Sequence, residues 1–354
     1  GFTGITSLVK RLGDPNEELN VIVKNSQNVE LSAQSVVVSP MYKDFDMGTQ
    51  DITNLGDITG AGTLTLGDSR NGTFTGATTI DSGATLQLNS GKLGGDITNN
   101  GTLYFYNPSS VNYAGVISGS GNVKQNYGSL YLSGTNTYTG NTTIGANGGA
   151  NFYLGYGGTT GSLASASNIS VASGSNLYFN RSNEMTVANV ISGAGSVSLL
   201  QKSGTEYNTA KGAIVTLTGN NTYTGSTYLN PYSQLQLGSG GTSGSLSSSS
   251  TIYMHYGTNL ISNRSDNVTI GNYLVNWNNQ SHGVSWGDGG RSNDFLQNGT
   301  GTVTLSNTTL NLGTLSATGN GVSYQGVTST VTTNAKTGYV SVVNTTGATA
   351  FTNG

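Results

Sequence analysis

The chain contains no cysteine, and it is poor in proline, in charge and in long apolar runs. The absence of cysteine excludes disulfides, thiolate metal sites and cysteine nucleophiles. Only 8% of the 354 residues are charged, against about 25% in a typical soluble protein. A formal net charge of -3 and a pI near 5.3 leave no basic footprint for nucleic acid. No apolar run approaches the roughly 18 residues of a transmembrane helix, so the sequence predicts no transmembrane segment.

The sequence opens with GFTGITSLVKRLGD, which lacks the apolar stretch of a secretory signal. If the protein is exported, the sequence is therefore expected to be a mature form.

The chain is rich in glycine and small polar residues, which stand where a typical soluble protein has charged ones. The chain has 54 Gly, and Ser, Thr and Asn occupy most of the remaining polar positions. It also has 19 Tyr and 8 Phe, together with a steady supply of β-branched residues. Disordered chains lack such residues, whereas strands favour them. The composition therefore favours a folded β-protein over a disordered one.

The first 46 residues differ from the rest. They hold ten charged residues and lack the Gly/Thr/Asn texture that follows. Within them, TSLVKRLGD predicts a short helix with Thr6 or Ser7 as its N-cap, and residues 20–39 alternate as one or two strands. We predict two regions, a cap or assembly arm at 1–46 and a solenoid at 47–354. The apolar residues expected to mediate assembly are Phe2, Ile5, Leu8, Leu12, Val21 and Val23.

From about residue 50 the chain repeats itself. LSGTNTYTGNTTI at 132–144 matches LTGNNTYTGSTYL at 217–229, and GTFTGATTI at 72–80 is a weaker form of the same stretch. Further along, 161–187 aligns with 244–270, and the G-x-G stretches ISGSGNV and ISGAGSV recur. Repeats of variable length indicate stacked structural units.

The repeats alternate with a period of two. Apolar or β-branched pairs such as Thr142 and Ile144, or Leu235 and Leu237, are separated by one residue, which is the pattern of a half-buried strand. Gly-Ser, Asn-Gly and Gly-Gly pairs mark turns. Many short strands in repeats predict a solenoid with roughly 20–25 residues per coil, whose equivalent side chains stack in ladders. Gly140 is expected at a corner that has no room for a side chain.

The stretches at 132–144 and 217–229, together with the I-S-G-x-G-x-V stretches at 117–123 and 191–197, resemble the autotransporter-associated β-strand repeat of bacterial surface proteins. The resemblance covers about 57–305. It implies an all-β fold, a single-stranded right-handed parallel β-helix, at the surface of a bacterium or outside it. The C-terminal segment lacks the pattern of a membrane barrel, and residues 1–46 lie outside the repeat. A trimeric β-fibre of similar composition stays an alternative.

The repeats contain no recognisable catalytic or metal-binding motif. Glycosidases need two carboxylates roughly 5–10 Å apart, but the acids after residue 100 are few, and Glu184 and Asp266 occupy nearly equivalent repeat positions. The two histidines, His255 and His282, have no ligand partner at metal-binding spacing. The G-x-G stretches precede no helix and are not phosphate loops. We therefore expect no enzyme activity and no cofactor.

One segment interrupts the repeat. Residues 272–297 hold both tryptophans among amides and glycines, and aromatic rings beside amides are suited to stacking on sugars. Alternatively, the segment has no binding role and is a longer loop or a capping coil with its tryptophans packed inward. Residues for ligand or partner contact are Trp277, His282, Trp286, Asp288, Arg291 and Asp294.

These observations predict a non-enzymatic extracellular β-helix that self-associates head to tail into a filament or matrix. Solenoid ends leave unpaired strand edges, which residues 1–46 would cap or join to a neighbouring subunit. The alternatives are a monomeric adhesin or passenger that binds a glycan or a cell receptor, a carbohydrate-binding module, and a polysaccharide lyase or glycosidase.

Overall fold

The structure is a computed structural model. It describes residues 8–10, 19–21, 36–37, 57–59, 63–66, 73–74, 76–89, 92–106, 110–200, 214–255, 257–272, 274–276, 294–300, 303–306, 314–317, 322–325, 333–335 and 340–343. Every regular element within these residues is a β-strand. The chain forms two compact units, the first made of Gly1–Phe152 and Thr160–Ser167, the second of Tyr153–Thr159 and Asn168–Gly354.

Parallel stacks of short strands build the first unit. One sheet has the order β13 (Ile117–Ser118), β10 (Ile97–Asn99), β7 (Thr78–Ile80), β4 (Asp57–Thr59), β3 (Val36–Val37). The second stacks β16 (Thr142–Ile144), β14 (Asn122–Gln125), β11 (Thr102–Phe105), β8 (Thr85–Leu88) and β5 (Thr63–Leu66). β12 (Ser110–Tyr113) pairs with β15 (Gly128–Leu132), and β6 (Thr73–Phe74) pairs with β9 (Lys92–Leu93) in a separate two-stranded sheet. β17 (Ala150–Leu154) is shared between the units.

Parallel stacks also build the second unit. β18 (Ile169–Val171) pairs with β21 (Ile191–Gly193). A second sheet has the order β19 (Asn176–Phe179), β22 (Ser196–Leu199), β24 (Thr227–Leu229), β26 (Ile252–Met254), β29 (Leu274–Asn276). A third has β20 (Met185–Val187), β23 (Ile214–Leu217), β25 (Gln234–Leu237), β27 (Asn259–Ser262), β30 (Asp294–Gln297), β32 (Thr314–Ala317), β34 (Thr333–Ala335). The fourth has β28 (Val268–Ile270), β31 (Val303–Ser306), β33 (Val322–Gln325), β35 (Val340–Val343).

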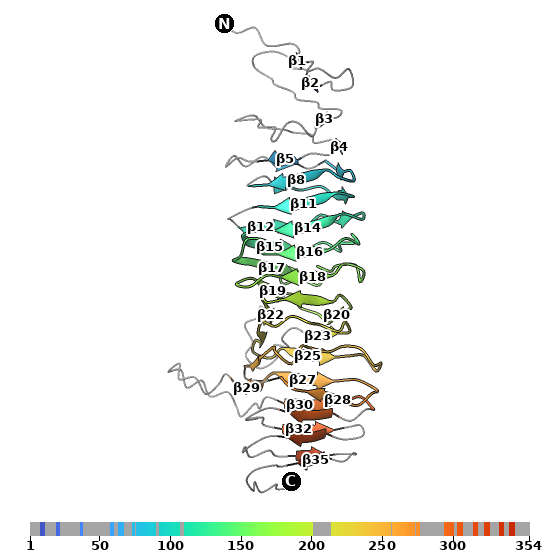
Figure 1. Cartoon of the computed structure of the whole chain (residues 1–354), viewed down its shortest axis with the longest axis vertical. Coiled ribbons are helices and arrows are strands. Elements are labelled where there is room, and N and C mark those ends of the chain that lie inside the picture. Colours follow the sequence, from blue (N-terminus) through green and yellow to red (C-terminus); the bar gives the residue numbers. More distant parts are fainter. Residues whose placement is uncertain are drawn as a thin grey trace, which may run out of the picture. The chain divides into compact units, whose positions relative to one another are not determined.

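From β4 onward, consecutive strands lie in different sheets and pair with strands one coil away, so each unit is a parallel β-solenoid, as predicted. Figure 1 shows the arrows of each unit stacked like rungs. Leu103 pairs with Leu86 of the preceding coil and with Val123 of the following one.

The coils differ in length. In the second unit Leu177 pairs with Val197, whereas Leu260 pairs with Phe295, so the later coil holds a much longer stretch of chain. The expectation of roughly 20–25 residues per coil is therefore too narrow, because the turns between strands absorb insertions.

The period of two in the sequence corresponds to the alternation of buried and half-exposed residues along the strands. Strands such as β8, β11 and β25 alternate between half-exposed and buried residues, and inward residues align in register. Leu86, Leu103 and Val123 form one such column, with no exposed surface. Because each coil buries its apolar edge only against its neighbours, stacking supplies the hydrophobic core.

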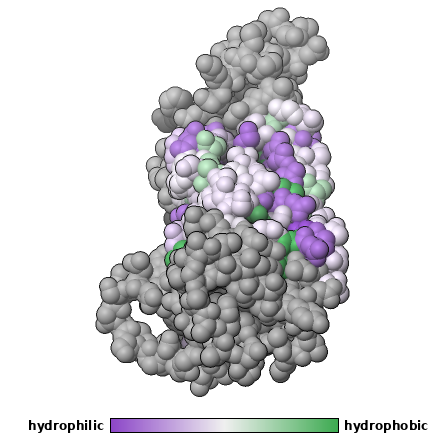
Figure 2. Space-filling model, turned by 60° about the horizontal axis from the view of Figure 1, so that its bottom comes forward, coloured by the Kyte–Doolittle hydropathy of each residue, from purple (hydrophilic) through white to green (hydrophobic). Residues whose placement is uncertain are grey.

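Outward tyrosines stack in the same way. Tyr153 and Tyr178 lie 4.4 Å apart between ring centroids with planes inclined by 10°, and Tyr228 and Tyr253 lie 5.1 Å apart at 10°. The predicted aromatic ladders are thus present in the second unit. On the face that Figure 2 shows, the described surface is mostly pale or purple with small green areas, because Ser, Thr and Asn cover it.

The N-terminal segment contributes strands. β1 (Leu8–Lys10) pairs antiparallel with β2 (Leu19–Val21), so the helix expected over TSLVKRLGD is wrong; strand pairing prevails over local capping signals. β3 pairs in parallel with β4 and continues a sheet of the solenoid. The boundary at residue 46 lies outside the described residues and stays a prediction.

Candidate functional site

Most residues predicted for ligand contact or assembly lie outside the described residues. These are Trp277, His282, Trp286, Asp288 and Arg291 in the interrupting segment, and Phe2, Ile5, Leu12 and Val23 near the N-terminus. Asp294 is the first residue of β30, between β27 and β32. Leu8 and Val21 are paired residues of β1 and β2. Sugar contact and assembly through these residues stay predictions.

The repeated stretch at 132–144 forms a buried polar clamp. Asn136, 2% exposed, accepts a hydrogen bond from the Ile117 N–H at 3.0 Å, and its Nδ2 donates to the Gly134 and Ser162 carbonyls at 3.0 and 3.2 Å. One side chain therefore joins three backbone segments. Buried polar groups are stable only when hydrogen-bonded, and the bonds to Ile117 and Ser162 tie one coil to its neighbours.

A chain of hydroxyls completes the clamp. Tyr138, with no exposed surface, shares a 2.6 Å hydrogen bond with Thr142 Oγ1, which shares a 3.1 Å bond with Ser167 Oγ. Gly140 lies where an added Cβ would be 2.2 Å from the Gly121 carbonyl oxygen, so the predicted corner is confirmed. Thr142 therefore has two roles in the core: its methyl group packs there, and its hydroxyl hydrogen-bonds to Tyr138 and Ser167.

The second copy reproduces these contacts. Asn221 accepts from Ile191 N–H at 2.9 Å and donates to the Gly219 and Ser245 carbonyls at 2.8 and 3.1 Å. Two further bonds link side-chain oxygens, Tyr223 to Thr227 at 2.7 Å and Thr227 to Ser250 at 2.9 Å.

Burial raises the pKa of both Tyr138 and Tyr223 well above the usual value of a phenol, so both hydroxyls stay protonated at neutral pH. The clamp contains no acid, base or nucleophile poised to react.

Acidic and metal-ligating side chains are dispersed in the part of the chain that the structure describes, and no group of three or more could hold a metal ion. Asp96 accepts a hydrogen bond from Val116 N–H at 2.8 Å. His255 is half-buried, and burial lowers its pKa.

Arg264 is the centre of a second cluster of polar contacts, separate from the clamp. Its Nε and Nη2 donate to the two carboxylate oxygens of Asp266 at 2.9 and 2.7 Å, and Nη1 and Nη2 donate to the carbonyls of Gly244 and Thr242 at 3.2 and 2.6 Å. The guanidinium thereby holds the turn 238–244 against the next coil. Its hydrogen bonds keep the pKa of Asp266 below the usual range of a carboxyl group.

The earlier copy has a matching arginine with a different partner. Arg181 Nε donates to Asn183 Oδ1 at 3.0 Å, while Glu184 is exposed. In the alignment of 161–187 with 244–270, Asp266 therefore corresponds to Asn183, and the near-equivalence of Glu184 and Asp266 inferred from the sequence is off by one residue. Asp266 has the structural role expected of it, in the ion pair with Arg264, but the expectation that Glu184 shares this role is wrong.

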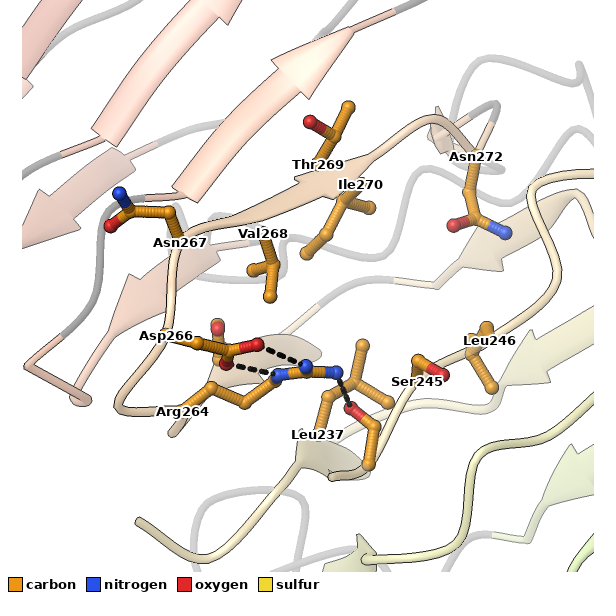
Figure 3. A pocket seen from close by; sticks show the side chains of 12 residues that line it. Leu237, Ser245, Leu246, Arg264, Asp266, Asn267, Val268, Thr269, Ile270 and Asn272 are labelled. Atoms are coloured by element: carbon orange, nitrogen blue, oxygen red, sulfur yellow. Dashed lines mark hydrogen bonds and ion pairs between the residues drawn. The ribbon is translucent and has the colours of Figure 1, made fainter. Parts of the chain in front are cut away.

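A cavity of about 180 Å³ adjoins the Arg264–Asp266 pair. Figure 3 shows Val268 and Ile270 of β28 pointing toward the ion pair and Leu237, whereas Thr269 points away. Ser262, at the end of β27, also lines the cavity; it has no exposed surface, and its Oγ has no hydrogen-bond partner among the described residues. The remaining lining residues are Gly244, Ser245, Leu246, Asn267 and Asn272.

Sequence reasoning missed both the clamp and this cavity. The clamp asparagines were visible as repeated residues, but their partners lie in neighbouring coils, far away along the chain. One difference between the aligned repeats is visible in the sequence: Phe179 in NLYF stands opposite Ser262 in NLIS, and the Ser262 hydroxyl is buried without a partner among the described residues. A large apolar residue replaced by a small polar one at an inward position predicts either a hole or a site.

Searches with protein-family models, curated proteins and solved structures find no match to this chain. The resemblance to the autotransporter-associated repeat stays a prediction, although the parallel solenoid that it implies is present. Within the described ranges, no helix is long and apolar enough to cross a membrane.

Proposed function

We propose that this chain is a non-enzymatic structural subunit of a bacterial surface, located outside the cell and self-associating end to end into a filament or matrix. The observation that supports it is the duplicated clamp: the most specific repeated residues, Asn136, Tyr138 and Thr142 and their copies, are buried and use their polar groups to hold coils together. A repeated motif whose polar groups join neighbouring coils is expected in a solenoid that serves as a structural subunit.

The N-terminal region supports assembly through its different pairing. β1 and β2 form the one antiparallel pair among the described strands, whereas β3 joins the parallel sheet next to β4. An unprotected parallel edge invites pairing with another chain. A hairpin beside such an edge either covers it or reaches to a neighbouring subunit. We propose that it reaches to a neighbouring subunit.

The test is assembly of the purified full chain, followed by light scattering and negative-stain electron microscopy over a range of concentrations. We expect polymers that grow with concentration. Deletion of residues 1–46 should abolish them while the β-rich circular dichroism spectrum persists. A chain that stays monomeric at the highest concentration contradicts the assembly and favours the adhesin alternative.

The non-enzymatic part of the proposal has its own test. The chain is incubated with acidic and neutral polysaccharides, and reducing ends and unsaturated products are measured. We expect no turnover above the buffer control. Turnover that disappears in Asp288→Ala or Asp294→Ala would show that the interrupting segment is catalytic.

A further inference from the structure

We propose that Asn147 is a site of spontaneous deamidation, where the side-chain amide is hydrolysed to a carboxylate while the chain stays folded. Asn147 lies in the turn 145–148, which follows β16 and precedes β17. The modification concerns the chemistry of this turn and does not depend on the structural role proposed above. It follows from the residue after Asn147 and from how loosely the turn is held.

An asparagine that precedes glycine is chemically prone to this reaction. The backbone nitrogen of the glycine loses its proton to water or hydroxide and attacks the asparagine Cγ. The Cγ–Nδ2 bond then breaks, and the amide nitrogen leaves as ammonia. Water opens the resulting five-membered succinimide at either carbonyl, so that amide plus water becomes carboxylate plus ammonium with no change of oxidation state. Glycine has no side chain to block the attack, and its backbone rotates most freely.

The described residues contain three Asn-Gly pairs, at 100–101, 147–148 and 298–299. Because the reacting atoms are the same in all three, the fold decides which pair reacts. The attack requires the peptide between the two residues to rotate until the glycine nitrogen faces the asparagine side chain. A pair that is hydrogen-bonded to neighbouring coils reacts only after those coils have opened, and such opening is least costly where few contacts hold the backbone.

Few contacts hold the turn around Asn147. Asn147 is exposed, and its side chain makes no hydrogen bond within the described residues. A Cβ added to Gly148 or to Gly149 would meet nothing within 4 Å, so the space around the turn is open. The Gly148 N–H donates to the Gly145 carbonyl at 2.8 Å, and this bond lies inside the turn itself. Rotation of the Asn147–Gly148 peptide therefore breaks one local hydrogen bond and leaves the neighbouring coils in place.

Asn100 is held by the coils on both sides of it. Its N–H donates to the Ile80 carbonyl at 2.7 Å, and its Oδ1 accepts from the Ser120 N–H at 3.3 Å. Gly101 packs so closely against the Ala84 carbonyl oxygen that an added Cβ would clash with it. Because these partners belong to the preceding and following coils, the peptide after Asn100 rotates only when the stack opens.

Asn298 is exposed, as Asn147 is, but its backbone is bound to another coil. The N–H groups of Asn298 and Gly299 both donate to the Ser262 carbonyl, at 2.8 and 3.3 Å. The second of these is the nitrogen that would have to attack, and an added Cβ on Gly299 would clash with the Arg264 carbonyl oxygen. Exposure of the side chain alone therefore does not select the site. Asn147 is distinguished by a backbone that no other coil holds.

The reaction changes the charge and the backbone of this turn. Each event adds one negative charge to a chain whose formal net charge is -3. The isoaspartate product also adds one carbon atom to the main chain, which the turn accommodates because solenoid turns absorb insertions. The buried residues on either side, Ile144 and Ala150, should keep their places in the core.

The test is peptide mapping by mass spectrometry after incubation of the full chain at mildly alkaline pH, in buffer and in concentrated guanidinium chloride. In the folded chain Asn147 should convert within about tenfold of its rate in denaturant, because one hydrogen bond must open. Asn100 and Asn298 should convert at least about tenfold more slowly than Asn147, because bonds to other coils must break. In denaturant all three should react at similar rates. Asn147→Gln, which disfavours the five-membered ring, should remove the product at this position and keep the circular dichroism spectrum of the parent.

Three results would overturn the proposal. The first is a folded chain in which Asn147 reacts no faster than Asn100 or Asn298. The second is a rate at Asn147 that lies more than about tenfold below its rate in denaturant, which would show that the turn stays closed. The third is a difference among the three sites that persists in denaturant, which would assign the selectivity to the flanking sequence instead of the fold.

Discussion

Replacement of Asn136 by alanine tests whether the repeated polar clamp holds the solenoid together. The side chain is 2% exposed and makes three hydrogen bonds to backbone groups, at 3.0, 3.0 and 3.2 Å. Asn136→Ala removes all three. The Ile117 N–H, on a fully buried residue, is left without its acceptor. The Ser162 carbonyl still accepts from the Asn136 backbone N–H at 3.0 Å.

The magnitude follows from these partners. A buried donor left unsatisfied costs about 1–3 kcal/mol, and each further lost bond contributes about 0.5–1.5 kcal/mol. Because the Ser162 carbonyl keeps its hydrogen bond from the Asn136 backbone N–H, the loss of its bond to the side chain contributes only about 0.5 kcal/mol, the lower end of that range. We therefore expect Asn136→Ala to lower the free energy of local unfolding by about 2–5 kcal/mol.

Native-state hydrogen exchange is the appropriate assay, because repeat arrays unfold in parts and a single unfolding free energy is poorly defined for them. The segment 117–125 should exchange faster, and about 2 kcal/mol corresponds to roughly 30-fold. Asn141→Ala is the matched control within the same motif, because Asn141 is exposed, and it should change exchange by less than about 0.5 kcal/mol. Equal effects of the two substitutions would refute the clamp.

Three further outcomes are expected. Gly140→Ala should destabilise the first unit by about 1–3 kcal/mol through overpacking, since its Cβ would lie 2.2 Å from a carbonyl oxygen, whereas Gly158→Ala, with nothing within 4 Å, should be neutral by thermal unfolding. Burial raises the pKa of Tyr138 and Tyr223 above the unfolded value of 10.0, so their contribution is complete below pH 10 and lost as the pH rises further. At pH 11 the two tyrosines together should lower the free energy of unfolding by about 3 kcal/mol. In the double Tyr→Phe variant, stability should fall less steeply with pH above 10, and a variant whose stability falls as steeply as that of the parent would contradict this expectation. The pKa of Asp266 is lowered from 3.8 by hydrogen bonds from the neighbouring guanidinium, so its contribution is present above pH 3.8 and disappears as the pH falls through the lower folded value. Asp266→Asn should abolish that acid-range change in the exchange protection of residues 238–244, and a change that remains would assign it to another group.

The solenoid was predictable because its pattern is local. Alternation of side chains along a strand and glycine at tight corners are properties of neighbouring residues. Thr142 and Ile144 were expected on one face and both are fully buried. Gly140 was expected at a corner, and the Gly121 carbonyl occupies the space of its missing side chain. The prediction of an N-terminal helix was wrong because local capping signals carry no information about the strand β2, with which Leu8–Lys10 pairs.

The candidate sites depend on contacts between coils. Ser167 Oγ bonds to Thr142, and the Ser162 carbonyl to Asn136, each from the following coil. The length of the connecting turns decides which residues meet, and those turns vary between copies. The change from Phe179 to Ser262 was visible in the sequence, but only the structure shows that the Ser262 hydroxyl is fully buried without a hydrogen-bond partner among the described residues.

The sequence by itself determined that this protein is an all-β repeat whose strands bury alternate residues, because those features arise from side chains next to one another in the chain. The tertiary structure alone decided which coils hydrogen-bond through Asn136 and Asn221, and that the guanidinium of Arg264 joins Asp266 to the turn at 242–244. The physical reason is that burial, hydrogen-bond satisfaction and cavity volume are properties of residues brought together by stacking, and the stacking register is set by turns whose lengths follow no period.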